Sequence, residues 1–184
     1  MKRITFFTTL FLLWLCGNTM SAQITEGVCN RSTWTLSSPA EPTEESETLA
    51  KAIDGNENTF YHSDWHSAGT PGSTLPQYFI IDTNETAVAD VQGFVYLPRP
   101  ANGNGTSSKM RVYFSDSEFD VSGGVTADAL TEKGYTPAAD VMFSYPDGRE
   151  YKAVGFTAAQ SGRYVLVVSD ASTSGTYFTC AEFY

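Results

Sequence analysis

One short segment combines both histidines of the chain with several aromatic residues. The run 59–66 reads Thr-Phe-Tyr-His-Ser-Asp-Trp-His. Two histidines four residues apart can share a zinc ion on one face of a helix, but this segment has the composition of a loop, which argues against zinc. An imidazole such as His62 can donate to a sugar hydroxyl, and an indole such as Trp65 can pack on the C–H face of a pyranose. The alternative is that Phe60, Tyr61 and Trp65 are core aromatics, as we expect for at least one of them.

A second group of polar residues follows an apolar run at 88–97. Arg99 leads into a loop rich in glycine and asparagine. Its guanidinium has five fixed donors and can hold vicinal hydroxyls or a carboxylate, while Asn102 or Asn104 can both donate and accept. Alone, an arginine at the end of a strand is more often part of a surface ion pair. Together with His62 on a neighbouring loop, these groups would form a binding site.

The run 54–59, Asp-Gly-Asn-Glu-Asn-Thr, places oxygen-bearing side chains at alternate positions, as at the start of a calcium loop. It is not an EF-hand, because Thr59 stands where that loop needs glycine and Trp65 where it needs a bidentate glutamate. The alternative is a simple turn formed by Asp-Gly and Asn.

The sequence carries no signature of catalysis. It has no Gly-x-Ser-x-Gly elbow and no phosphate-binding loop, and neither Cys29 nor Cys180 lies in a local catalytic motif. The four glutamates within 41–47 form a polar stretch that is typical of a solvated face. We predict that the protein is not an enzyme and that any associated catalysis lies on a partner chain.

Composition restricts the partners and the fold. The chain has 184 residues with 11 Lys+Arg and 21 Asp+Glu, giving a net charge of −10. This charge disfavours nucleic acid and anionic lipid headgroups as partners. Hydrophobic residues make up 41% of the chain and aromatic residues 14%, which predicts one globular core.

The N-terminus has the pattern of an export signal. Lys2 and Arg3 precede an apolar run at 6–15, and small residues end at Ala22. The run is too short to span a bilayer. Cleavage after Ala22 removes two positive charges, leaving 162 residues with a net charge of −12. We expect a periplasmic, cell-surface or secreted protein; a lipid anchor on Cys16 is disfavoured by the bulky residues before it.

Two cysteines remain after such cleavage, Cys29 and Cys180, near the two ends of the mature chain. In an oxidising compartment an even number favours pairing, so we expect a disulfide between them. The alternative is two buried thiols.

The hydrophobic pattern is that of an all-β protein. Short β-branched and aromatic runs lie between turn residues at 77–82, 88–97, 109–115, 151–156, 163–169 and 177–184. The alternation in 109–115 predicts one solvated face, and the continuous run 163–168 predicts a central strand. The one helical candidate is 44–53. This pattern predicts a two-sheet β-sandwich.

Several ordered motifs together resemble the factor V/VIII type C (discoidin) superfamily, and within it most closely the family 32 carbohydrate-binding modules. The resemblance covers 29–184 and rests on the segments 49–65, 75–82, 96–99, 111–116, 162–165 and 181–183. It implies a jelly-roll sandwich of about eight main antiparallel strands. It also implies a structural calcium ion bound by Lys51, Asp54, Asn56, Thr59, Ala181 and Glu182.

The resemblance further implies a galactose-type ligand at loops on one end of the sandwich. Its expected contacts are His62, Trp65, Arg99, Asn102 or Asn104, the acidic Glu45, and an aromatic platform at Phe178 or, with a shifted loop, Tyr177. Tyr61 departs from the tryptophan usual in this motif, and 68–75 and 117–146 do not match the family pattern, which leaves the sugar preference open. The alternative function is a protein-binding adhesion module; expected partners are a glycan and a glycan-active enzyme or surface protein.

Overall fold

The computed structural model describes residues 27–184 except 43, 67–72, 85–87, 101–102 and 146. The expected export signal at 1–22, Cys16 within it, and Asn102 lie outside these residues. No helix in the described part is long and apolar enough to cross a membrane.

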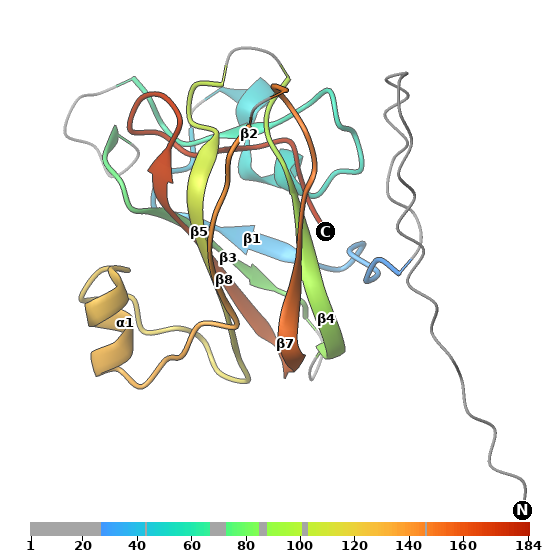
Figure 1. Ribbon diagram of the computed structural model, residues 1–184, viewed down its shortest axis with the longest axis vertical. Helices are drawn as coiled ribbons and strands as arrows, with labels where there is room; N and C mark the ends of the chain where they lie inside the picture. The colour runs from blue at the N-terminus through green and yellow to red at the C-terminus, as the bar shows by residue number, and fades with distance from the viewer. Residues whose placement is uncertain (1–26, 43, 67–72, 85–87, 101–102, 146) are drawn as a thin grey trace, which may run out of the picture.

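Strands dominate the described residues (Figure 1). They are β1 (Thr35–Ser37), β2 (Tyr61–His62), β3 (Gln77–Asp82), β4 (Val88–Leu97), β5 (Ser107–Ser115), β6 (Ala139–Met142), β7 (Lys152–Gly162), β8 (Tyr164–Ser172), β9 (Thr179–Cys180) and β10 (Glu182–Phe183). One α-helix, α1 (Ala127–Glu132), and two 3-10 helices, η1 (Glu45–Glu47) and η2 (Leu49–Ala52), complete the set.

The strands form a sandwich of antiparallel sheets. One sheet has the order β1-β3-β8-β5-β6, the opposing sheet has β10-β4-β7, and β2 pairs with β9. All these pairings are antiparallel. The predicted all-β sandwich is therefore confirmed. The central position of the run 163–168 is also confirmed, because its residues from Tyr164 onward lie in β8 between β3 and β5.

Two local features differ from the sequence pattern. The segment 44–53 is helical as predicted but forms two 3-10 helices, and the α-helix α1 was not predicted. The run 109–115 lacks a fully solvated face, because Arg111 and Tyr113 on its outward side are buried as well as Met110 and Val112. The cover on the outward side is the insert 116–138, which contains α1.

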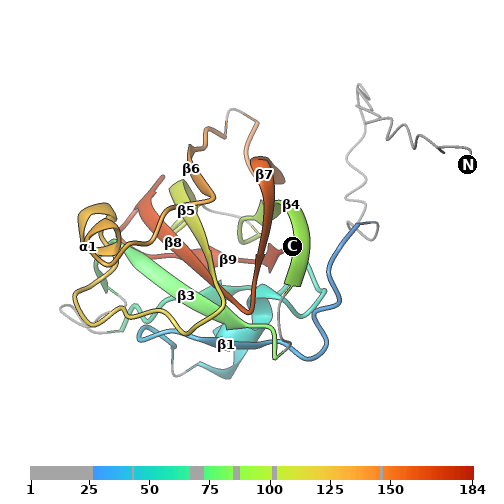
Figure 2. The ribbon, with the colours of Figure 1, turned by 90° about the horizontal axis from the view of Figure 1, so that it is seen from below.

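The protein has a hydrophobic cluster on each side of the large sheet. The main cluster lies between the sheets and is rich in aromatics, among them Tyr61, Phe79 and Phe178. A smaller cluster packs Phe119 and Leu130 of the insert against the outward face. Figure 2 shows α1 on one side of the sheet and β4 and β7 on the other. The single predicted core is thus divided by the sheet.

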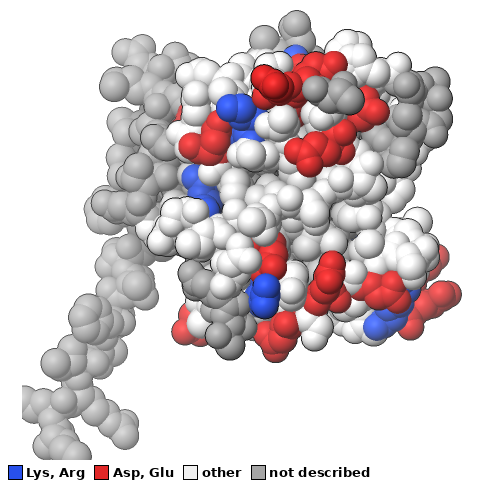
Figure 3. All heavy atoms as spheres, turned by 180° about the vertical axis from the view of Figure 1, so that it is seen from behind, with Lys and Arg blue, Asp and Glu red and all other residues white. Residues whose placement is uncertain are grey.

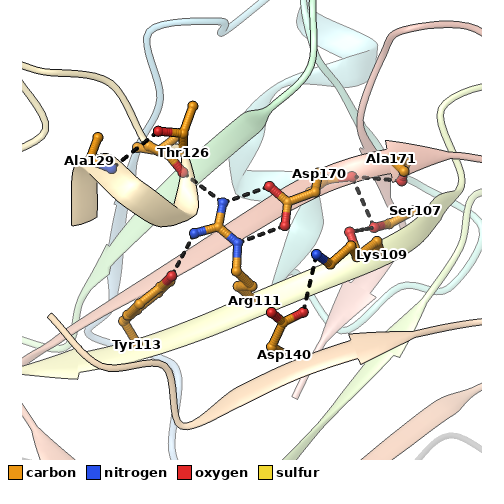
Figure 4. Close-up of polar contacts among 11 residues, drawn as sticks. Ser107, Lys109, Arg111, Tyr113, Thr126, Ala129, Asp140, Asp170 and Ala171 are labelled. Carbon is orange, nitrogen blue, oxygen red and sulfur yellow. Dashed lines mark hydrogen bonds and ion pairs between the residues drawn. The ribbon is translucent and has the colours of Figure 1, made fainter. Parts of the chain in front are cut away.

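A buried arginine fastens the insert to the sheet (Figure 4). The Arg111 side chain is 1% exposed and donates from Nε and Nη2 to the Asp170 carboxylate, both at 2.6 Å. Its Nη1 donates to the Tyr113 hydroxyl at 2.5 Å, and its Nη2 also donates to the Val125 carbonyl at 2.7 Å. A buried charge requires such compensation. The contacts join β5, β8 and the start of the insert.

The expected disulfide is wrong, because the sulfurs of Cys29 and Cys180 are not bonded to each other. Cys180 lies in β9 opposite Tyr61, fully buried in the main cluster. Burial raises the pKa of its thiol well above the usual range. Cys29 is half-buried in the segment before β1. The core position of Cys180 therefore explains its burial without a covalent bond.

Asp170→Ala tests the importance of the buried pair. The substitution removes the carboxylate that pairs with the buried Arg111 guanidinium. The free energy of unfolding measured by urea denaturation should therefore fall by about 3 kcal/mol. Asp140→Ala is the matched control, because its ion pair with Lys109 is exposed at both ends. That control should cost less than about 1 kcal/mol. Equal losses in the two variants would contradict the assignment.

Candidate functional site

Strand β2 directs Tyr61 into the main cluster and His62, which is 3% exposed, to its other side. Side chains alternate across a strand, so Phe60 and His62 lie on one side and Tyr61 on the other. Tyr61 is fully buried and makes edge contacts with Phe79 and Phe178. Tyr61, where the family motif usually has tryptophan, is therefore a core residue. Its neighbours Phe60 and His62 are directed to the candidate site.

His62 is oriented by a hydrogen bond, and its surroundings favour the neutral imidazole. Its Nδ1 lies 2.7 Å from the Ser63 carbonyl, which can only accept, so Nδ1 carries the proton and Nε2 is an acceptor. The hydrogen bond of Nδ1 is the one that the His62 side chain makes with the described residues. Desolvation lowers the pKa of His62 below 6.5, and Arg99 adds to this, against the opposing effect of the bond to Ser63. A neutral imidazole accepts from a ligand hydroxyl, whereas the sequence analysis expected it to donate.

Two aromatic rings flank His62. The Tyr177 ring centroid lies 5.3 Å and the Trp65 centroid 6.5 Å from that of His62. Trp65 is 45% exposed, and its Nε1 donates to Glu47 Oε2 at 3.1 Å. The Trp65 ring also contacts the His66 ring in a tilted arrangement, with the centroids 3.8 Å apart. These contacts fix an exposed apolar wall beside His62.

Phe178 was expected to be an aromatic platform for the ligand, and this prediction is wrong. It is fully buried and stacks in parallel on Phe79 with centroids 5.6 Å apart. Its backbone bonds to Ser63 in both directions, which aligns the two segments. Side chains alternate across the chain, so the neighbouring Tyr177 faces outward and takes the place expected of Phe178.

Arg99 reaches the same side of β2. Its guanidinium carbon lies 4.3 Å from the centroid of Phe60, a cation–π contact. Its Nε is buried and has no hydrogen-bond partner in the described structure. The electrostatic effect of Arg99 on His62 places the two groups in one environment. A buried donor without a partner is costly, so a ligand acceptor that reached Nε would offset this cost.

Asn104 is brought to the site by the pairing of its loop with β9. Thr106 forms a parallel bridge with Thr179, the residue that pairs with His62. The Asn104 side chain lies against Gly175, where an added Cβ would be 2.5 Å from Oδ1. Gly175 has φ +74°, a second reason for glycine at this position. Asn104 is therefore the asparagine that the described structure places at the site.

Glu45 is exposed and makes no hydrogen bond or ion pair among the described residues. Its neighbours in and before η1 make the contacts instead: Glu47 bonds to Trp65, and Glu44 lies 2.7 Å from Nε2 of His66. Sequence reasoning missed both glutamates and the role of Phe60. The position of Phe60 could have been predicted from the sequence, because side chains two residues apart in an extended segment lie on the same side, as Phe60 and His62 do.

The expected calcium residues meet where the 54–59 loop approaches the last strand. Thr59 Oγ1 donates to both oxygens of Asp54, at 3.0 and 2.8 Å, and the Asn56 amide donates to Asp54 Oδ1. The Gly55 amide donates to Glu182 Oε1 at 2.5 Å. Loop and strand are thus joined through oxygen-bearing side chains that suit a hard cation.

Glu182 is fully buried, and its second oxygen accepts from Arg31 Nη1 at 2.6 Å. Desolvation raises the pKa of Glu182 and Asp54 raises it further, against the lowering effect of Arg31. The Lys51 ammonium lies 3.4 Å from Asp54 Oδ2. A cation between Asp54 and Glu182 would relieve the repulsion between the two carboxylates, so these carboxylates could hold calcium. No three His, Cys, Asp or Glu side chains within the described residues form a metal cluster. Neutral oxygens, the expected carbonyls of Lys51 and Ala181 included, would therefore complete the coordination.

Comparisons with known proteins agree with this geometry. The sequence profile of the F5/8 type C domain matches residues 33–183. A search of curated proteins found no match. Among solved structures, the family 32 carbohydrate-binding module of Clostridium perfringens NanJ, in complex with galactose, is similar with a TM-score of 0.63 at 21% identity, covering 83% of this chain and 93% of that one.

Two further C. perfringens structures are similar. CpGH89CBM32-5, in complex with GalNAc-β-1,3-galactose, has a TM-score of 0.65 at 19% identity and covers 83% of this chain and 94% of its own. CBM32-3 from a family 31 glycoside hydrolase has a TM-score of 0.62 at 19% identity, covering 84% and 91%. At these identities the likeness establishes the fold.

An NMR titration of the imidazoles tests the state of His62. Long-range ¹H–¹⁵N spectra, assigned with His62→Gln, should show the Nδ1–H tautomer and a midpoint below 6.5. Because folding favours the neutral form, the stabilising contribution of His62 is present above its unfolded pKa and is lost as pH falls through the lowered folded value. The slope should be at most about 1.4 kcal/mol per pH unit. Tyr177→Ala should move the midpoint upward by admitting water; a midpoint above 6.5 in the wild type would refute the assignment.

Proposed function

The chain belongs to the F5/8 type C domain family and has the fold of family 32 carbohydrate-binding modules, and from this premise we propose that it is an exported carbohydrate-binding protein that recognises a galactose-type sugar. The observation that carries the proposal is the convergence of His62, Arg99, Asn104, Trp65 and Tyr177 on one side of β2. These residues come from three separate segments of the chain: the segment around β2, the loop between β4 and β5, and the loop before β9. They combine acceptors, donors and apolar walls, as sugar recognition requires.

Each side chain has a distinct task in this proposal. Nε2 of His62 accepts a hydrogen bond from one sugar hydroxyl, and Arg99 donates to the oxygen of that hydroxyl or of the neighbouring one. The Asn104 amide can both donate to and accept from a hydroxyl. Trp65 and Tyr177 pack on the C–H-rich side of the ring. A shallow site of this size supports only modest affinity, so clustering or a linked partner would supply avidity.

Calcium has a structural role in the proposal. The ion would be held by Asp54, Thr59 and Glu182 side chains with neutral oxygens from Lys51, Asn56 and Ala181. When bound, it supplies positive charge between two carboxylates. The 54–59 loop leads directly into Phe60 and His62, so its anchoring fixes the start of the sugar site.

Export and the lack of catalysis complete the proposal. The basic and apolar pattern at 1–22 supports secretion to the periplasm, the cell surface or the medium. The site groups bind hydroxyls and have no arranged nucleophile or acid–base pair. The domain would thus deliver a partner enzyme or surface protein to a glycan.

Calorimetric titration with galactose, N-acetylgalactosamine and lactose tests the sugar site. Arg99→Ala should lower affinity at least tenfold, because it removes the donor that faces the ligand. Arg163→Ala is the matched control: it also removes one charge, but from a partly exposed pair with Asp82. The control should bind as the wild type does. Unchanged affinity in Arg99→Ala would refute the site, and no heat with any sugar in folded wild type would favour a protein ligand.

Thermal unfolding in calcium and in EDTA tests the ion. At a calcium concentration 100 times the dissociation constant, binding adds about 2.7 kcal/mol, which raises Tm by roughly 5–10 °C in a domain of this size. Asp54→Ala should lose the response, and Asp140→Ala should keep it. An equal Tm in both buffers would show that calcium does not bind the folded state.

A further inference from the structure

A cleft of about 400 Å³ lies beside Arg99, on the side formed by the segments around β4, β5 and β7. Its lining residues come from three segments: Pro98, Arg99, Gly103 and Thr106 from the loop before β5, Tyr145, Gly148 and Arg149 from the loop before β7, and Thr173 after β8. Arg99 is the residue that this cleft shares with the proposed sugar site. A ligand bound at His62 could therefore extend into it.

The two arginines of the cleft differ from the other cations of the protein. Within the described residues, Lys51, Lys109, Lys133, Lys152, Arg31, Arg111 and Arg163 each lie within 4 Å of a carboxylate. Arg99 and Arg149 do not. The chain carries an excess of acids, and acidic side chains outnumber basic ones on the face in Figure 3. Two uncompensated cations in one cleft of such a protein indicate a site for an anion.

Backbone carbonyls hold Arg149 in place without neutralising it. Its Nε donates to the Pro98 carbonyl at 2.8 Å, and its Nη2 donates to the Glu57 carbonyl at 2.5 Å. Its Nη1 makes no hydrogen bond with a described residue. The Glu57 carboxylate is engaged by the Tyr151 hydroxyl, and the Glu150 carboxylate by Lys152. The guanidinium is thus positioned in advance, which lowers the entropic cost of binding.

Arg99 supplies a second positive charge to the lining of the cleft. Its guanidinium lies on Phe60, and its buried Nε has no partner in the described structure. Arginine forks match the planar oxygens of a carboxylate and the oxygens of a sulfate ester. Tyr145, whose hydroxyl donates to the Ser107 carbonyl at 2.6 Å, gives the cleft an aromatic wall.

We propose that this cleft is a second subsite, in which Arg99 and Arg149 bind the anionic group of an acidic glycan, a uronic carboxylate or a sulfate ester, joined to the galactose-type sugar at His62. The inference rests on the proposed function and narrows its ligand to acidic galactose-containing glycans. The subsite confers preference for charge, while the His62 side of the site holds the neutral ring.

Calorimetric titration at low salt with four probes tests the subsite: lactose, 3′-sulfolactose, methyl galactoside and trigalacturonic acid. At least one acidic probe should bind at least tenfold more tightly than its neutral counterpart, and 0.5 M NaCl should reduce that preference. The sulfated and uronic arms distinguish the two sources of charge. Arg149→Gln should abolish the preference and leave affinity for the neutral probes within twofold. Lys133→Gln, which removes one charge at the insert, should keep the preference.

The outcomes separate this inference from the proposed function. Neutral probes that bind as well as acidic ones, or a preference that survives in Arg149→Gln, overturn the subsite and leave the sugar site intact. The absence of binding by all four probes to folded, calcium-loaded protein overturns both. A preference that is lost in Arg149→Gln and kept in Lys133→Gln supports the subsite.

Discussion

A buried carboxylate requires compensation by positive charge or by hydrogen-bond donors, and Glu182 imposes this requirement where three parts of the chain meet. One carboxylate oxygen of Glu182 accepts a hydrogen bond from the Arg31 guanidinium in the N-terminal segment, and the other accepts from the Gly55 backbone amide in the 54–59 loop. The last strand thereby anchors the loop that leads into β2. The position of Phe60 and His62 follows from that anchoring, and the proposed sugar site depends on it.

A second buried charge organises the other side of the large sheet. Arg111 joins β5 and β8 to the insert, and the insert covers a separate hydrophobic cluster. This arrangement assigns the charged residues different tasks. Arg31, Arg111 and Arg163 are neutralised by carboxylates and stabilise the fold, whereas Arg99 and Arg149 are held by an aromatic ring or by backbone carbonyls. Because no carboxylate neutralises Arg99 and Arg149, these two side chains remain able to attract an anionic ligand.

Much of the fold could be predicted because local pattern and burial agree. The continuous apolar run in β8 favoured a central strand. The family motifs selected His62, Trp65 and Arg99, and the structure places Trp65 beside His62 and Arg99 on Phe60. The errors arose where a distant segment decides the environment. The insert buries the outward side of β5, so its alternating pattern misleads. The main cluster encloses Cys180 and Phe178, so neither forms the disulfide or the platform that was expected of it.

The sequence by itself determined the class of fold, the acidic character and the residue types available to the proposed sugar and calcium sites, because these depend on composition and short-range spacing. The tertiary structure decided which of two adjacent aromatics faces the site, that His62 is an acceptor, and that Arg99 and Arg149 share a cleft. These features depend on strand register and on carbonyl positions set by residues far away in the chain. Such long-range geometry leaves no local pattern in the sequence.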